Sequence, residues 1–214
     1  MTVPPSNARF ITFEGIDGAG KTTHLRTVQH FLEASGERVC VTREPGGTRL
    51  GEAIRALFLA HSMHAATEAL LVFAARREHL EEVVWPALAR GEWVLCDRFT
   101  DATRAYQGAG RGLGMTAIDA LAAWVHPDFA PVLTFLFDLS PAAAQARISD
   151  RDRLDRFERE AQTFHERVRN AYLEQAAREP ERFCVLDATL AKSVVATTIE
   201  SRVGELVARL ASPA

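Results

Sequence analysis

A short glycine-rich segment near the N-terminus constrains the fold of this 214-residue chain more than any other feature. The segment 15–22 reads GIDGAGKT and matches the pattern GxxxxGK[ST]. It follows an apolar run, residues 9–14, and precedes a stretch with helical periodicity. Glycines in such a loop let backbone N–H groups approach phosphate oxygens, and the helix N-terminus adds a favourable partial charge. The sequence therefore predicts a strand–loop–helix unit that holds the phosphates of a nucleoside triphosphate.

The loop assigns a first set of site residues. Lys21 is expected to reach the β- and γ-phosphates, and the Thr22 hydroxyl is expected to hold Mg²⁺. The residues expected to bind ATP are Gly15, Ile16, Asp17, Gly18, Ala19, Gly20, Lys21, Thr22 and Thr23. No NKxD motif follows, as a GTP switch would require, and the chain leaves little room for the partner domains of a motor ATPase. A compact kinase is favoured.

Five short apolar runs alternate with longer segments of helical periodicity. The runs cover residues 9–14, 38–42, 93–97, 132–139 and 182–187, and the helical segments cover about 22–35, 49–60, 67–90, 115–125, 157–179 and 192–211. Nearly continuous apolar runs are typical of parallel strands buried on both faces. The pattern predicts an α/β P-loop kinase fold with a five-stranded parallel sheet and helices on both faces. Without any linker, residues 1–214 are expected to form one domain.

Composition excludes several other classes. The formal net charge of −3 gives no bulk attraction to nucleic acid, and no run approaches the ~18 apolar residues of a membrane span. Three widely spaced cysteines in apolar surroundings predict free buried thiols rather than a metal site. Such thiols indicate a reducing compartment, so a cytoplasmic location is expected.

Polar motifs follow the apolar runs where a parallel sheet would place a site. They include TREPGGT at residues 42–48, CDRF at 96–99, AYQGAGRG at 105–112 and LDRFE at 154–158. Together with FEGIDGAGKTT and LLVFAARREH, these motifs cover nearly the whole chain and resemble the bacterial thymidylate kinase family. The resemblance implies that the chain phosphorylates dTMP to dTDP with ATP and Mg²⁺, and that it forms a homodimer. The alternatives are another (deoxy)nucleoside monophosphate kinase on the same scaffold and a nucleotide-binding switch without phosphoryl transfer.

The resemblance also implies an acceptor site. Arg98 would clamp the acceptor phosphate, Asp17 would contact the 3′-hydroxyl, and Tyr106 would crowd the 2′ position. The full set expected to bind the acceptor is Asp17, Arg43, Glu44, Pro45, Arg55, Phe73, Arg76, Arg98, Thr103, Tyr106 and Gln107. Asp97 would order Mg²⁺ through water, and Glu14 would act either on metal-bound water or as a structural hydrogen-bond acceptor.

Three of these assignments stay open. Phe73 resembles the ring that stacks on thymine, but an ordinary core aromatic would have the same spacing. Arg76 and Arg77 follow Phe73 by three and four residues, so both share its helix face. The downstream spacing favours Arg76 as the arginine that reads the base, with Gln107 as its partner on the same base edge. Arg55 is either a second phosphate-binding arginine or a solvated charge on a helix.

Residues 147–160 resemble the family's mobile lid. Gly18 stands where some thymidylate kinases carry an arginine in the phosphate loop, so the catalytic arginine is expected from the lid. This matches the lid-arginine subtype, with Arg151 favoured over Arg153. The expected catalytic set is Lys21, Arg98, Arg151 and Arg153.

Overall fold

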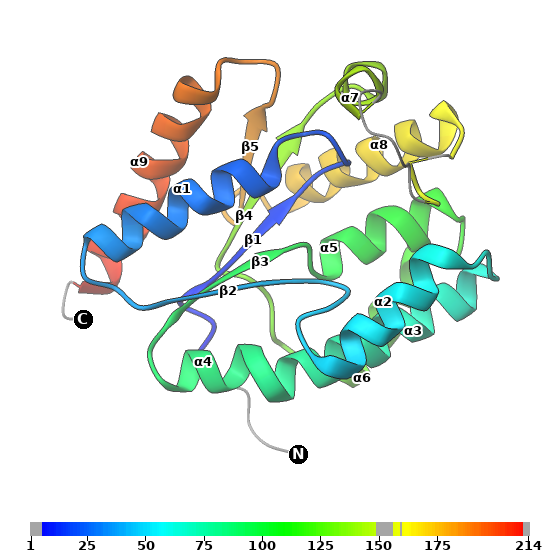
Figure 1. Ribbon diagram of the computed structural model, residues 1–214, viewed down its shortest axis with the longest axis horizontal. Helices are drawn as coiled ribbons and strands as arrows, with labels where there is room; N and C mark the ends of the chain where they lie inside the picture. The colour runs from blue at the N-terminus through cyan, green and yellow to red at the C-terminus, as the bar shows by residue number, and fades with distance from the viewer. Residues whose placement is uncertain (1–5, 149–155, 159, 212–214) are drawn as a thin grey trace.

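A five-stranded parallel sheet forms the centre of the molecule, with strand order β2-β3-β1-β4-β5 (Figure 1). The computed structural model describes residues 6–148, 156–158 and 160–211. The strands are β1 Phe10–Glu14, β2 Val39–Arg43, β3 Trp93–Asp97, β4 Leu133–Asp138 and β5 Phe183–Asp187. The strand order reverses beside β1, and in such sheets a ligand crevice opens at the carboxyl ends of the strands around this point.

Helices cover both faces of the sheet. Helices α1 and α9 pack together on one face, and α4 and α6 lie on the other (Figure 1). The helices are α1 Lys21–Ala34, α2 Arg49–Ala60, α3 Ala65–His79, α4 Trp85–Ala89, α5 Thr100–Thr103, α6 Met115–Val125, α7 Pro141–Ile148, α8 Gln162–Arg178 and α9 Lys192–Ala211. The predicted fold class is confirmed. Among the described residues, no helix combines the length and apolar character that a membrane crossing needs.

Burial differs between the central and the edge strands. Every residue of β1 is buried, whereas β2 has only half-buried and exposed residues and β5 buries only Phe183 and Leu186. An edge strand has a neighbour on one side only, so the prediction of full burial is wrong for these two strands. Cys96 on β3 is buried, but Cys40 and Cys184 lie on the edges and are half-buried free thiols.

Two π-helical turns were not expected from the sequence. The predicted helix 67–90 is divided by η1, Leu80–Val84, and a second turn, η2, spans Arg104–Gly110. Turns of this kind often occur at functional sites because they widen the helix and redirect side chains. Here η2 carries Tyr106 and Gln107 toward the carboxyl ends of the strands.

Candidate active site

The glycine-rich loop joins β1 to α1, as the motif predicts. Gly15, Gly18 and Gly20 have φ angles of 131°, 81° and 96°, a region that other residues rarely adopt. A Cβ atom on Gly15 would lie 2.6 Å from the carbonyl oxygen of Phe137, so this position has no room for a side chain. Gly20 caps the N-terminus of α1, where unpaired N–H groups favour an anion.

Lys21 lies inside this loop. Its Nζ donates to the carbonyl oxygens of Gly15 and Ile16, each at 3.1 Å, and lies 3.7 Å from an Asp17 carboxylate oxygen. Burial, together with the charge of Arg98, lowers the pKa of Lys21. The neighbouring Thr22 is exposed at the start of α1. The loop thus presents a buried ammonium and an accessible hydroxyl, the pair that binding of an NTP–Mg²⁺ complex requires.

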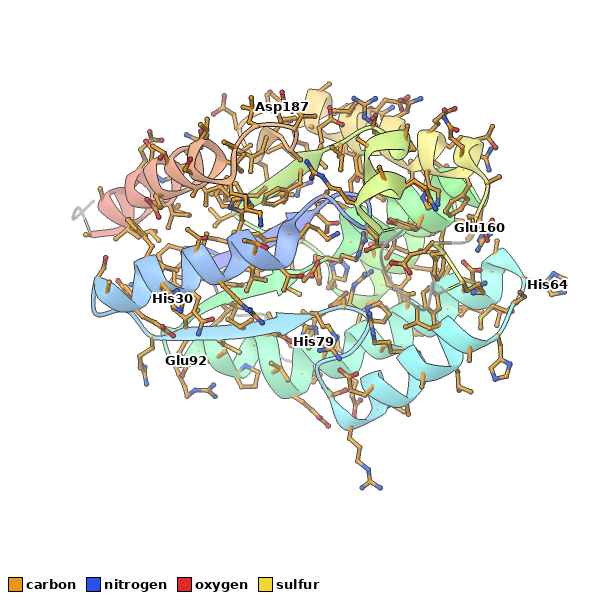
Figure 2. All side chains as sticks on the ribbon, turned by 45° about the horizontal axis from the view of Figure 1, so that its top comes forward. His30, His64, His79, Glu92, Glu160 and Asp187 are labelled. Carbon is orange, nitrogen blue, oxygen red and sulfur yellow. The ribbon has the colours of Figure 1, made fainter. Side chains whose placement is uncertain are left out.

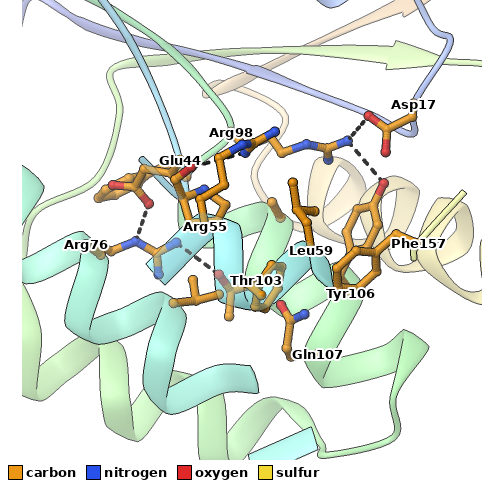
Figure 3. Close-up of a pocket in the computed structure, with 15 residues that line it drawn as sticks. Asp17, Glu44, Arg55, Leu59, Arg76, Arg98, Thr103, Tyr106, Gln107 and Phe157 are labelled. Carbon is orange, nitrogen blue, oxygen red and sulfur yellow. Dashed lines mark hydrogen bonds and ion pairs between the residues drawn. The ribbon is translucent and has the colours of Figure 1, made fainter. Parts of the chain in front are cut away.

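A pocket of about 590 Å³, its solvent-filled mouth included, begins beside this loop (Figure 3). Its size falls in the range of small-molecule sites. It runs from Asp17 and Arg98 at the phosphate loop to Arg76 and Gln107 at the opposite end (Figure 3). The pocket therefore offers cationic groups at both ends and aromatic or aliphatic walls between them.

Arg98 holds a conformation that costs free energy. Its φ angle of 72° lies in the left-handed region, which is uncommon for a residue with a side chain and costs roughly 1–3 kcal/mol. Its guanidinium donates to Asp17 Oδ1 at 2.8 Å, to the Tyr106 hydroxyl at 3.1 Å and to the Tyr172 hydroxyl at 3.2 Å. Burial raises the pKa of Asp17, but the charges of Arg98 and Lys21 outweigh burial and hold that pKa well below its usual range. Strain of this kind concentrates at functional sites, and here it aims a guanidinium into the pocket beside the phosphate loop.

Arg76 forms the other end of the pocket. Its Nε donates to Glu44 at 2.7 Å and one terminal nitrogen donates to Thr103 Oγ1 at 2.9 Å. The other terminal nitrogen is buried and has no hydrogen-bond partner within the described part of the chain. An unpaired buried donor is costly unless a ligand satisfies it. Arg76, which lines the pocket, therefore keeps one N–H group that no described protein group satisfies.

His79 contacts the Glu44 carboxylate that also binds Arg76. It is fully buried between β2 and α3, whereas His64 projects from the start of α3 (Figure 2). Its Nδ1 lies 2.9 Å from Glu44 Oε1, and its Nε2 lies 2.6 Å from Thr42 Oγ1. His79 thus helps to hold the Glu44 carboxylate in place for Arg76.

Comparison with known proteins identifies the family. Residues 13–199 match the sequence model of a protein family described as thymidylate kinase. A thymidylate kinase from Nitrosospira multiformis is 53% identical over 202 residues, which are 94% of this chain and 98% of that protein. One from Ralstonia nicotianae is 52% identical over 202 residues, covering 92% and 98% of the two chains. The chain belongs to the thymidylate kinase family.

A solved structure supports the same conclusion. The crystal structure of thymidylate kinase from Ehrlichia chaffeensis superposes with a TM-score of 0.73 at 36% identity, covering 91% of this chain and 97% of that one. The expected fold and the expected enzyme class, a phosphotransferase, are confirmed.

The pocket unites most of the residues expected to bind the acceptor of a thymidylate kinase. The expected residues that line it are Asp17, Glu44, Pro45, Arg55, Arg76, Arg98, Thr103, Tyr106 and Gln107. The lining residues that were not among the expected acceptor residues are Phe58, Leu59, Val72, Phe99, Ala102 and Phe157. Arg55 thus belongs to the pocket and is not a purely solvated charge. Arg43 does not line the pocket, because it pairs with Glu52 at the surface at 2.7 Å.

Phe73 is not where the resemblance placed it. Its ring is buried in the core, where it stacks on His126 at 6.3 Å and lies under the Arg76 guanidinium at 4.7 Å. The pocket wall at this place is Val72, which precedes Arg76 by four residues. Adjacent helical residues point about 100° apart, so Phe73 and Val72 cannot both face the pocket. The core-aromatic interpretation of Phe73 is correct, and the i,i+4 spacing to Arg76 is the signal that marks Val72.

The choice between the two neighbouring arginines follows from the same geometry. Arg77 turns away from the pocket: it donates to the Val125 carbonyl at 2.9 Å, pairs with Glu81, and lies 5.0 Å from the centre of the Trp85 ring. Of these two arginines, it is Arg76 that lines the pocket.

Glu14 is used structurally. One carboxylate oxygen accepts the Phe99 N–H at 2.7 Å and the other accepts the Tyr172 hydroxyl at 2.7 Å. Burial, reinforced by the negative charge of Asp101, raises the pKa of Glu14 to about 8. Both oxygens are thus engaged in joining β1 to the segment after Arg98 and to α8, which agrees with the hydrogen-bond alternative.

The end of α7 contacts the phosphate loop. Arg147 donates to the Gly18 carbonyl at 3.4 Å and to the Ala188 carbonyl at 2.8 Å. Arg151 and Arg153, the two expected lid arginines, lie outside the described residues.

Proposed function

We propose that this chain transfers the γ-phosphoryl group of ATP to the phosphate of dTMP, with ATP on the glycine-rich loop and dTMP in the adjoining pocket. One observation carries the proposal: a single pocket has the strained Arg98 guanidinium beside the phosphate loop and the unpaired Arg76 N–H at its far end. A nucleoside monophosphate has this polarity, since it is anionic at one end and carries hydrogen-bonding groups on its base at the other. A phosphate lying against Arg98 would be adjacent to the γ-phosphate of an ATP on the loop.

Mg²⁺ is part of the proposal, and the residues present fit it. Asp97 Oδ1 is buried without a hydrogen-bond partner within the described residues, at the end of β3 beside the phosphate loop. No cluster of three or more ligating side chains occurs in the described part of the chain. Mg²⁺ commonly takes few protein ligands and relies on phosphates and water, so the Thr22 hydroxyl and a water on Asp97 suit it. The bound ion would neutralise charge on the transferring phosphoryl group.

The residues of the chain supply positioning and charge. Arg98 and Arg55 would hold the acceptor phosphate, Asp17 the 3′-hydroxyl, and Tyr106 would crowd the 2′ position. The acceptor is already an anion, so phosphoryl transfer needs alignment and positive charge more than a general base. Gly18 has no side chain that could supply this positive charge. We assign the charge to Lys21 and to a lid arginine, Arg151 or Arg153. Closure of the lid over ATP would exclude water and limit hydrolysis.

The chain is further proposed to act as a cytoplasmic homodimer. Leu70 on α3 and Trp124 on α6 border the same surface groove and are 57% and 71% exposed, an unusual arrangement for large apolar side chains. Trp85, by contrast, is buried and belongs to the core. The free thiols support a reducing compartment. Light scattering during gel filtration tests the dimer: a mass of one chain would contradict it.

An acceptor panel tests the proposed reaction. ADP release from ATP is measured with dTMP, dUMP, dCMP, dGMP and AMP, each with and without Mg²⁺. The expected result is the fastest Mg²⁺-dependent release with dTMP. Release with dTMP no faster than without any acceptor would contradict the proposal, and a higher rate with another monophosphate would assign the site to that nucleotide.

A further inference from the structure

A buried carboxylate that no sequence motif marks lies behind the base-binding end of the pocket. Glu68, in the first turn of α3, is fully buried. Its Oε2 accepts the Gln107 side-chain amide at 3.1 Å, and its Oε1 accepts Arg156 at 2.6 Å. The Nε of Arg111 lies 3.2 Å from one carboxylate oxygen and 3.3 Å from the other. Two guanidinium groups thus balance this buried charge, as a buried carboxylate requires.

The contact with Glu68 fixes which way the Gln107 amide points. A side-chain amide has a donor end and an acceptor end, whereas a carboxylate only accepts. The end of Gln107 facing Glu68 must therefore be its NH₂ group. Gln107 also lines the pocket, and no donor within the described residues reaches its Oε1. The pocket is left with a carbonyl oxygen from Gln107 and, from Arg76, a free N–H.

This pair matches one class of base edge. Thymine and uracil present an N3–H donor next to the O4 acceptor, while cytosine presents an N3 acceptor next to an amino group. We infer that Glu68 is a positioning residue that sets the base selectivity of the acceptor site, by holding the Gln107 carbonyl toward N3–H. The inference rests on the proposed function, since it takes the pocket as the dTMP site. If the Gln107 amide were reversed, its NH₂ group would face the N3–H donor of thymine. The same NH₂ group could donate to the N3 acceptor of cytosine.

Glu68 also fixes a wall of the same pocket. The Arg156 guanidinium, which Glu68 binds, lies 4.5 Å from the centre of the Phe157 ring and donates through Nε to the Phe58 carbonyl at 3.2 Å. The Phe157 ring lines the pocket and stacks on Phe58 at 5.0 Å. One carboxylate therefore holds both the base-reading amide and the aromatic wall beside it.

Glu68→Gln tests the inference through substrate selectivity. The new amide can donate as well as accept, so it no longer dictates the orientation of Gln107. We expect the ratio of kcat/KM for dTMP over dCMP to fall about tenfold, mainly through KM, the loss expected from one misdirected hydrogen bond. The ratio for dTMP over dUMP is expected to stay unchanged, because both bases carry N3–H and O4. Loss of a purely structural contact would not separate these two ratios.

Three further variants make the result decisive. Glu68→Asp keeps the charge for the arginines but withdraws the acceptor by one methylene, so it should lower the same ratio even if Glu68→Gln does not fold. In a Gln107→Ala background, Glu68→Gln should change the dTMP-to-dCMP ratio no further. Glu205→Gln, an exposed acid on α9, is the matched control and should leave both ratios unchanged.

The outcomes separate this inference from the proposed function. Any one of three results would overturn the inference about Glu68. The dTMP-to-dCMP ratio could be unchanged in both Glu68 variants, or kcat/KM could fall equally for dTMP, dUMP and dCMP. The third is that Glu68→Gln changes the ratio as much in the Gln107→Ala background as in the wild-type chain. If the wild-type chain does not phosphorylate dTMP, the proposed function itself fails, and that result precedes any measurement on Glu68.

Discussion

Replacement of Arg76 by lysine gives a quantitative test of the base-binding end. Lysine keeps a positive charge beside the buried Glu44 but lacks the forked guanidinium. In Arg76, one terminal nitrogen of that fork donates to Thr103 at 2.9 Å and the other has no partner within the described residues. The lost contact to the base is a hydrogen bond from a charged donor, worth about 1.5–3 kcal/mol. This range corresponds to a loss of roughly 10- to 150-fold in kcat/KM for dTMP.

The neighbouring arginine is a matched control. Arg77→Lys changes the same residue type one position along the same helix, but the Arg77 side chain contacts Val125 and Trp85 outside the pocket. We expect less than about twofold change in kcat/KM for this variant, since it removes no pocket contact. Initial rates of ADP release over a range of dTMP concentrations, with thermal unfolding of both variants, supply the comparison. A larger loss in Arg77→Lys, or no loss in Arg76→Lys, would refute the assignment of base reading to Arg76.

Three more predictions concern the phosphate loop, the metal and the core. Gly15→Ala should lower the free energy of unfolding by about 2–5 kcal/mol in urea titrations, because its Cβ would meet the Phe137 carbonyl at 2.6 Å and its φ is 131°. Asp97→Asn should raise the Mg²⁺ concentration for half-maximal activity about tenfold while leaving the unfolding midpoint nearly unchanged; an unaltered Mg²⁺ titration would count against the water-mediated contact. The pKa of Glu14, about 8 when folded and 4.5 ordinarily, means that its folded form binds a proton more tightly than the unfolded chain. Its stabilisation is complete below pH 4.5 and is lost as the pH rises from there to about 8, by about 1.4 kcal/mol per pH unit, so Glu14→Gln should flatten the pH dependence of stability between pH 5 and 8.

The parts of the site that local sequence determines could be predicted. The glycine-rich loop needs only one strand, one turn and one helix, so its motif specifies both the structure and the ligand class. The acceptor residues on TREPGGT and CDRF follow strands β2 and β3, and a parallel sheet brings such strand ends together. Arg98 and Glu44 therefore lie in one pocket, although they are far apart in the sequence.

The sequence could not decide which side of α3 faces the pocket. This helix packs against α2 on one side and α6 on another, so apolar residues occur all around it and periodicity does not single out one face. The position of Phe73 was wrong for this reason. The π-helical turn η2 likewise has no local signature.

Glu68 was missed for a different reason. An acid in the first turn of a helix is ordinarily a solvated residue that interacts favourably with the helix dipole. Its burial depends on Gln107, Arg111 and Arg156, which lie 39, 43 and 88 residues away along the chain. Such a cluster becomes visible only when the chain is folded.

A crystal structure of the chain with dTMP and a non-hydrolysable ATP analogue tests the central claim most directly. The account predicts dTMP in the pocket between α2 and η2, with its phosphate on the Arg98 guanidinium, its O4 within hydrogen-bond distance of the unpaired Arg76 nitrogen, and its N3 facing the Gln107 carbonyl. A dTMP bound with its base toward Arg98, or bound outside this pocket, would contradict the account.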